Sequence, residues 1–285
     1  MSFAQAMLLA VLQGVSELFP ISSLGHTVLV PALLRWDIDE GSESFLAFVV
    51  VLHFGTAVAL IVFYRDTWLA LGRSFARSIA RGRFSDDPQE RVAWLLVAGT
   101  IPVAILGVLL QSAVKALFAS PIPVSLFLAA NGALMLFGER LRRREHAVAG
   151  RPYRTLASLT PRDGALVGLA QSLALLPGIS RSGSAIVAGL LRGLHHDDAA
   201  RYSFLLATPV IFAAAVLEIP TLFAPDARAA LLQSAGGCVV AGVTAYASVA
   251  FLTRWFRSND LGPFAWYCLG AGILSFILFV TKVIA

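Results

Sequence analysis

Two stretches of this chain interrupt an apolar helix with polar residues, and the two stretches resemble each other. The first interruption falls in QGVSELFPISSLGH at residues 13–26, and the second in QSLALLPGISRSGS at residues 171–184. When one is laid over the other, Gln13 coincides with Gln171 and Gly25 coincides with Gly183. In a membrane protein, paired interrupted helices in the two halves of a chain point to the functional site.

The composition places the chain in a membrane. Of its 285 residues, 58% are hydrophobic and 14% are charged, and the mean hydropathy is +0.77. Several apolar runs reach the roughly 20 residues needed to cross a hydrocarbon core of about 30 Å. The net charge of +5 comes from arginines in loops between these runs, so we predict no nucleic-acid partner. Cys238 and Cys268 lie in apolar runs without metal-ligand spacing, which disfavours a disulfide or metal role.

The predicted fold is an all-α polytopic membrane protein with a single integral membrane domain, residues 1–285. Apolar runs predict six transmembrane helices, at about 44–64, 92–110, 122–138, 202–222, 232–252 and 264–284. The interrupted segments 3–34 and 163–194 are each too short for two clean crossings, and Pro20 and Pro177 disrupt a helix interior. We therefore predict two re-entrant helix-loop-helix elements, because non-helical backbone at this depth must be buried in protein or line a wet cavity.

Arginine-rich loops predict the orientation. The positive-inside rule places loops 65–91 and 139–162 in the cytoplasm. The acidic stretch 37–43 and the first re-entrant element then lie outside, and the second re-entrant element enters from the cytoplasm. The second half repeats the first in the opposite orientation, which is an inverted-topology repeat with a first repeat of about 1–140 and a second of about 163–285.

Glu17 is the most conspicuous residue of the first interruption. A carboxylate at mid-helix depth costs roughly 2.5–3.5 kcal/mol on insertion scales, so it needs a partner or a wet pocket. Gln13 precedes it by one helical turn on the same face. His26 follows about one turn beyond Ser22 and Ser23. We predict a functional role for these residues; the alternatives are a structural acid paired with an arginine and a histidine that satisfies a local carbonyl.

The second interruption resembles an anion cradle. Ser180-Arg181-Ser182-Gly183-Ser184 opens a helix that runs to about Gly193. Free N–H groups at a helix start favour anions, and the planar fork of Arg181 suits phosphate oxygens. The alternative is that Arg181 only neutralises Glu17. The predicted substrate- and phosphate-binding residues are Gln13, Ser22, Gly178, Ser180, Ser182, Gly183 and Ser184.

If the two interruptions meet at the midplane, one cavity holds the parts that phosphoryl transfer uses. His26 is a candidate base or nucleophile, and Ser23 a candidate nucleophile activated by a histidine. Glu17 could orient His26 or, with Gln13, hold a divalent ion, since Mg²⁺ favours oxygen ligands. His53 lies mid-span and either faces the same cavity or is structural. The run His195-His196-Asp197-Asp198 is interpreted as a solvated cytoplasmic loop.

With these residues in view, the chain resembles the undecaprenyl-diphosphate phosphatase family of the bacitracin-resistance type, over nearly its whole length. The family's first motif is similar to Gln13-Gly14-Val15-Ser16-Glu17 with the adjoining Pro20-Ile21-Ser22-Ser23-Leu24-Gly25-His26. Its second motif is similar to Pro177-Gly178-Ile179-Ser180-Arg181-Ser182. Ala185 replaces the final Thr of that motif, with Ser184 one position earlier, and Gln13 stands where some members have a second carboxylate.

The resemblance implies hydrolysis of a polyprenyl diphosphate lipid to undecaprenyl phosphate and inorganic phosphate, in the bacterial inner membrane, at a site open to the extracytoplasmic side. It implies dependence on Mg²⁺ or Ca²⁺. It also implies that Glu17 is a metal-linked or base-supporting carboxylate, Ser23 and His26 are nucleophile and activator in unassigned order, and Arg181 is the phosphate clamp. A polyprenyl-phosphate transporter without hydrolytic activity is the alternative, and a homodimer is left open.

Overall fold

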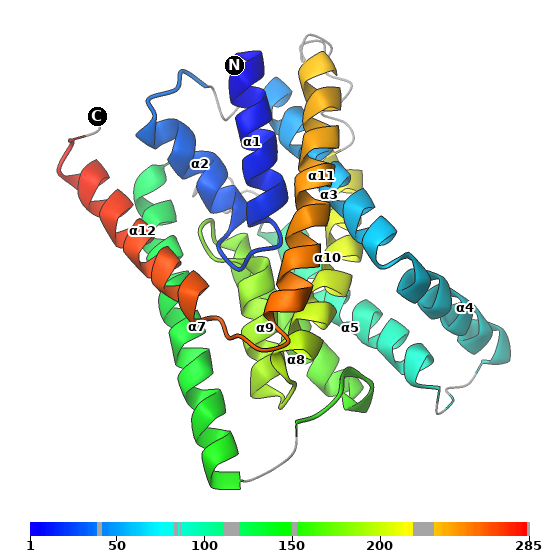
Figure 1. Ribbon diagram of the computed structural model, residues 1–285. Helices are drawn as coiled ribbons and strands as arrows, with labels where there is room; N and C mark the ends of the chain where they lie inside the picture. Colours follow the sequence, from blue (N-terminus) through cyan, green and yellow to red (C-terminus); the bar gives the residue numbers. More distant parts are fainter. Residues whose placement is uncertain are drawn as a thin grey trace.

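The computed structural model describes residues 1–38, 42–82, 85, 87–110, 120–149, 153–218 and 231–283. The described residues form helices, with one isolated bridge between Arg154 and Leu194. In chain order the helices are α1 (Phe3–Ser16), α2 (Ser23–Leu33), α3 (Glu43–Phe63), α4 (Arg65–Arg81), α5 (Pro88–Leu109), α7 (Pro121–Ala149), η1 (Leu156–Ser158), α8 (Pro161–Gln171), η2 (Ser172–Leu175), α9 (Arg181–Leu191), α10 (His196–Glu218), α11 (Leu231–Trp255) and α12 (Gly262–Val280) (Figure 1).

Five of the described helices are long and apolar enough to cross a membrane: α3, α5, α7, α11 and α12. They coincide with five of the six predicted spans. Helix α10 covers residues 202–218 of the remaining one, whereas residues 219–222 lie outside the described residues. The chain is therefore a multi-pass membrane protein. Residues 39–41 of the predicted outer loop, and Arg83 and Arg151 of the predicted cytoplasmic loops, also lie outside the described residues.

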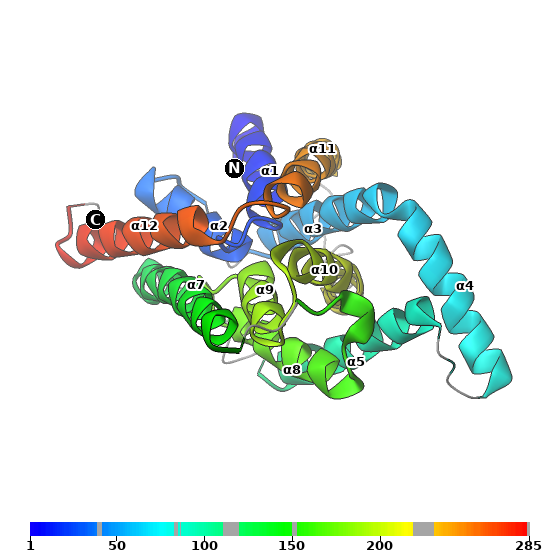
Figure 2. The ribbon, with the colours of Figure 1, turned by 60° about the horizontal axis from the view of Figure 1, so that its bottom comes forward.

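The predicted cytoplasmic loop 65–91 contains a helix of its own. Helix α4 buries Leu71, Ser74 and Ser78 on one side and exposes its arginines on the other. Its inner side is fastened to α5, because the Trp94 indole donates to the Ser78 hydroxyl at 2.9 Å. It projects from the edge of the bundle (Figure 2).

Both predicted helix interruptions are present, and they are built alike. Helix α1 ends at Ser16 and α2 begins at Ser23, while α8 ends at Gln171 and α9 begins at Arg181. A hydroxyl caps each new helix at the same offset. Ser22 Oγ accepts from the Gly25 N–H at 3.3 Å, and Ser180 Oγ accepts from the Gly183 N–H at 3.1 Å. The likeness seen in the sequence is thus a likeness of local structure.

The first helix of each half packs on a helix of the other half. Helix α1 lies against α11, and α8 lies against α5. Glycine allows both approaches: a Cβ on Gly14 would come within 2.4 Å of the Ala241 carbonyl oxygen, and one on Gly168 within 2.2 Å of the Gly99 carbonyl oxygen. Because the helix backbones are in contact at these glycines, α1 is held against α11 and α8 is held against α5.

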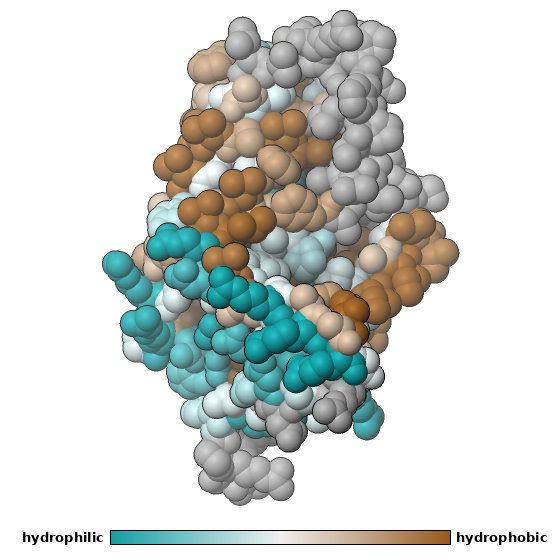
Figure 3. All heavy atoms as spheres, turned by 90° about the vertical axis from the view of Figure 1, so that its right-hand side faces the viewer, coloured by the Kyte–Doolittle hydropathy of each residue, from teal (hydrophilic) through white to brown (hydrophobic). Residues whose placement is uncertain are grey.

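Helix α10 forms the centre of the bundle. It packs against α3, α5, α9 and α11, and Tyr202, Phe204 and Leu206 are fully buried on it. The Tyr202 hydroxyl donates to the Leu95 carbonyl at 2.8 Å, which removes the cost of burying it. On the face drawn in Figure 3, hydrophilic side chains gather in a band toward the lower end and apolar side chains lie above it.

Candidate active site

Glu17 is buried at the end of α1 and is surrounded by hydrogen-bond donors. Its Oε2 accepts from the Ser23 hydroxyl at 2.5 Å and from the Gln13 amide at 3.2 Å. Its Oε1 accepts from the Arg181 guanidinium at 3.1 Å. The Nε2 atom of His53 lies 3.5 Å from Oε2. The two interruptions therefore share one site, as predicted, and Glu17 is its centre.

The adjacent serines Ser22 and Ser23 have different environments. Ser23 begins α2 and points its hydroxyl at Glu17. Ser22 precedes the helix, has a φ of +72°, and directs its hydroxyl to the backbone of Gly25. A positive φ is costly for a residue with a Cβ, and such strain persists only where the surroundings impose it. The strained turn at Ser22 aims Ser23 at the carboxylate.

His26 is buried close by but is not paired with Ser23. Its Nδ1 lies 2.7 Å from the Ser22 carbonyl oxygen, and its Nε2 lies 2.7 Å from the hydroxyl of Tyr267 in α12. Among the described residues, Ser23 donates to Glu17, and no hydrogen bond joins Ser23 to His26. The structure thus offers Glu17, not His26, as the group that can accept the Ser23 proton.

Arg181 spans the gap between the two interruptions. Its guanidinium contacts Glu17 and also donates to the Ser203 carbonyl of α10 at 3.3 Å. Only part of its five-donor fork is used by these contacts, and its side chain is 11% exposed. The pairing with Glu17, named as an alternative from the sequence, is therefore present, and it leaves donors for a phosphate oxygen.

The remaining predicted phosphate-binding residues line the second interruption. Ser180 and Ser182 hydroxyls lie 3.0 Å apart, and Ser182 Oγ donates to the Phe19 carbonyl at 3.2 Å. The Ser184 hydroxyl is buried and has no hydrogen-bond partner among the described residues. Ala185, in the place of the motif Thr, is also buried. At this helix start, the buried Ser184 hydroxyl is therefore left to hydrogen-bond a ligand.

Two glycines and one asparagine join the interruptions. A Cβ on Gly25 would lie 3.0 Å from the Gly178 Cα, and Gly178 itself has a φ of +107°. Asn131, buried in α7, donates from Nδ2 to the Pro20 carbonyl at 3.0 Å and accepts at Oδ1 from the Ser180 N–H at 3.0 Å. It satisfies one backbone group of each turn at once.

Sequence reasoning left His53 open and missed Asn131 and Tyr267. His53 was noted because a histidine in mid-span is unusual, and its contact with Glu17 resolves the choice in favour of the site. Asn131 carried the same signal, a lone amide inside the apolar run 122–138. Tyr267 carried none, since aromatic residues are common in apolar spans.

Comparison with known proteins identifies the family. Residues 6–274 match the family described as bacitracin resistance protein BacA. A relative from Acidiphilium cryptum named undecaprenyl-diphosphatase is 51% identical, with 96% of each chain covered. Relatives with the same name are 46% identical in Mycolicibacterium paratuberculosis, with 97% of each chain covered, and 46% identical in Gluconacetobacter diazotrophicus, with 98% of this chain and 97% of the relative covered. The chain belongs to this family.

In this BacA family member, the site residues do not by themselves form a site for a resident metal. Among the described residues, no group of three or more His, Cys, Asp and Glu side chains converges. Glu17 is the only carboxylate of the site as described, and both of its oxygens accept hydrogen bonds. The Gln13 Oε1 atom is a buried acceptor without a partner among the described residues, but one amide oxygen does not complete a cation shell.

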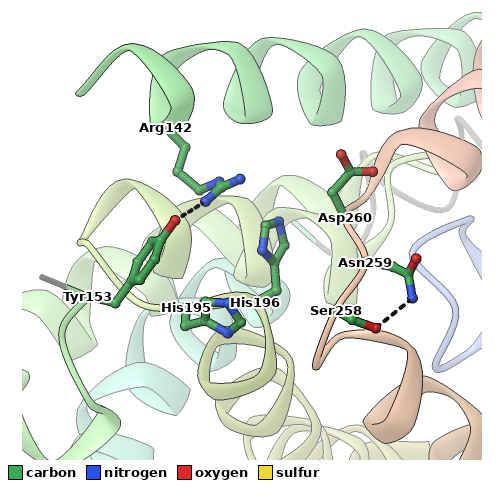
Figure 4. Close-up of a pocket in the computed structure, with 7 residues that line it drawn as sticks. All are labelled: Arg142, Tyr153, His195, His196, Ser258, Asn259 and Asp260. Carbon is green, nitrogen blue, oxygen red and sulfur yellow. Dashed lines mark hydrogen bonds between the residues drawn. The ribbon is translucent and has the colours of Figure 1, made fainter. Parts of the chain in front are cut away.

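A separate cavity of about 350 Å³ lies near the end of α7, lined by residues that include Arg142, Tyr153 and His196 (Figure 4). His196 is buried and its Nε2 lies 2.6 Å from Glu139, so the interpretation of residues 195–198 as a solvated loop is wrong for His196. Arg142 also pairs with Glu139, at 3.3 Å. The buried Glu139 carboxylate therefore has two partners, as a buried charge in this BacA family member needs.

Proposed function

We propose that this chain is an undecaprenyl-diphosphatase of the bacterial inner membrane, which hydrolyses undecaprenyl diphosphate to undecaprenyl phosphate and inorganic phosphate. The observation that carries the proposal is the short hydrogen bond from Ser23 to Glu17, with Arg181 on the other oxygen of the same carboxylate. An activatable hydroxyl, a base and a guanidinium in contact with one another are what transfer of a terminal phosphoryl group requires.

The geometry favours Ser23 as the nucleophile. Its oxygen would attack the terminal phosphorus while its proton passes to Glu17. The bond from phosphorus to the bridging oxygen breaks, and undecaprenyl phosphate leaves. Water then hydrolyses the serine phosphate and releases inorganic phosphate. His26 is less suited to attack from the conformation observed, because both of its ring nitrogens are engaged.

Arg181 links substrate binding to base strength. In the free protein its charge stabilises the ionised Glu17 carboxylate and so weakens it as a base. An incoming diphosphate competes for the same guanidinium, because Arg binds phosphate through two parallel hydrogen bonds. Binding would therefore free Glu17 to accept the Ser23 proton only when a phosphoryl group is in place. The hydroxyls of Ser180, Ser182 and Ser184, the amide of Gln13, and the backbone at Ser22, Gly178 and Gly183 are the proposed phosphate contacts.

The proposed topology is six transmembrane helices and two re-entrant elements in an inverted repeat, about 1–140 and 163–285. The exchanged packing of α1 on α11 and α8 on α5 supports it. The arginine-rich loops are proposed to be cytoplasmic and the site to open to the extracytoplasmic side. Single cysteines at Asp37 and Arg257, in a background without Cys238 and Cys268, test the orientation with a membrane-impermeant thiol reagent. Asp37→Cys should react in intact cells and Arg257→Cys only after lysis; reaction of both in intact cells contradicts the map.

The experiment that tests the function uses purified protein in detergent with undecaprenyl diphosphate, and measures phosphate release with Mg²⁺, with Ca²⁺ and with a chelator. We expect release by the wild type and its loss in Glu17→Ala and Arg181→Ala. Movement of polyprenyl phosphate across liposomes without release would instead support the transporter. Dependence on a divalent cation stays a prediction, and because the side chains form no metal site, the cation would arrive with the diphosphate. A homodimer likewise stays a prediction, for light scattering to test.

A further inference from the structure

Tyr267 contacts the site from a helix that faces lipid. It lies in α12, its side chain is about half exposed, and its hydroxyl reaches inward to the buried His26. The helix neighbours of α2 are α1 and α7, and the chief neighbour of α12 is α7. Between α2 and α12 as the structure describes them, the bond from Tyr267 to His26 is the only hydrogen bond.

The bonding of His26 fixes which nitrogen can react. A carbonyl oxygen only accepts, so the Nδ1 atom facing the Ser22 carbonyl carries the proton. In the neutral ring, Nε2 then has the lone pair, and the Tyr267 hydroxyl donates to it at 2.7 Å. The two rings are nearly parallel, at 10°, with centroids 5.7 Å apart. Ser22 and Tyr267 together hold the imidazole from both sides.

From this geometry we propose that Tyr267 is a positioning residue for His26. It holds the ring in one tautomer and covers Nε2, the nitrogen with the lone pair. Because an isoprenoid tail stays in the bilayer, the headgroup has to enter from a side that faces lipid. Tyr267 stands on such a side, so a P–OH group of the entering headgroup takes over from the phenol hydroxyl as the donor to Nε2. The proposal rests on the proposed function, and it adds a contact between His26 and the diphosphate headgroup to the steps carried out by Ser23 and Glu17.

The test compares Tyr267→Phe with the wild type and with a matched control, Tyr246→Phe. Tyr246 is a similarly exposed tyrosine in α11 whose ring packs on Phe63, and among the described residues no hydrogen bond or ring contact joins it to His26. Purified full-length protein in detergent is treated with diethyl pyrocarbonate, which reacts with an unprotonated imidazole nitrogen. Mass spectrometry gives the labelling rate of His26, and the partly exposed His195 in the same sample serves as a folding and reagent reference.

We expect Tyr267→Phe to raise the labelling rate of His26 about fivefold, the effect of losing one ordinary hydrogen bond, and Tyr246→Phe to leave it unchanged. We also expect kcat of Tyr267→Phe for the lipid diphosphate to fall about tenfold while KM stays within about threefold, because a positioning loss acts on the transition state. Unchanged labelling, or unchanged kcat, overturns the proposal. Absence of phosphate release in the wild type would refute the proposed function instead, and the labelling result would stand apart from it.

Discussion

Glu17 shows how one buried carboxylate is made tolerable and useful by its neighbours. Ser23, Gln13 and Arg181 donate to it, and His53 lies close. Removing one partner of a buried charge destabilises the protein by more than the net energy of the pair, because the remaining charge stays buried without compensation. Each neighbour of Glu17 should therefore affect activity, including those that never touch the substrate.

His53 offers the sharpest test at the residue scale. His53→Leu removes the ring that faces Glu17 and should lower kcat/KM for phosphate release about 10- to 100-fold, the cost of one contact to a charged group. His195→Leu is the matched control, since that histidine is partly exposed and bonded to Asp197, away from Glu17. Equal activities of the two variants would show that His53 does not support the carboxylate.

At the scale of elements, the two interruptions have the same local structure. Each has a serine that caps the following helix three residues on, and each turn is tied to α7 through Asn131. The sequence predicted the interruptions because Pro and Gly break helices in a recognisable pattern. It did not predict that Asn131 links the two turns, because a single amide on a distant helix has no recognisable sequence pattern.

The Asn131 link can be removed with little change in side-chain volume by replacing Asn131 with Leu. Asn131→Leu leaves the Ser180 N–H unpaired in the interior and leaves the Pro20 carbonyl only a weak bond from the Cys268 thiol at 3.7 Å, and an unpaired buried group costs about 1–3 kcal/mol. We expect a lower melting temperature in detergent together with lower phosphatase activity. Asn259→Leu, at an exposed loop position, is the control and should change both little. A stable and fully active Asn131→Leu would mean that the two turns keep their positions without the Asn131 hydrogen bonds.

Asp163 ties the two ends of the second interrupted element together. It lies at the start of α8 and pairs with Arg192, which follows α9, at 2.7 Å and with Arg154 at 3.1 Å. Burial alone would raise the pKa of this carboxyl, but hydrogen bonds from Thr160 and both arginines hold the pKa well below its ordinary value. A carboxyl with a lowered folded-state pKa stabilises the fold above its unfolded pKa of about 4, and loses this contribution as pH falls through the folded value.

Comparison of melting temperatures across pH tests this contribution. Asp163→Asn should melt below the wild type at neutral pH, and the difference should shrink as pH falls below about 4. The control is Asp66→Asn, because the Asp66 side chain is 89% exposed and the change should give no difference at either pH. A difference that is the same at neutral and acidic pH would exclude the charged form of Asp163 as its source.

At the scale of the whole molecule, the sequence predicted the membrane class, the two interruptions and the union of Glu17 with Arg181, since each follows from hydropathy, proline and charge. It did not predict that Ser23 pairs with Glu17 instead of His26. That choice depends on the strained turn at Ser22 and on Tyr267 from the far end of the chain. It also missed the burial of His196, because a polar run in a loop gives no sign of the Glu139 that covers it.

The central claim is that Glu17 activates Ser23 as the nucleophile, at a site that Arg181 of the second half completes. Phosphate release by Ser23→Ala and Ser22→Ala tests it most directly, because the two serines are neighbours and only one faces the carboxylate. We predict that Ser23→Ala loses more than about 1,000-fold in kcat, as removal of a nucleophile does. Ser22→Ala, which loses a helix cap but keeps the backbone proposed to contact phosphate, should stay within about tenfold of the wild type. Near-normal release by Ser23→Ala would contradict the account.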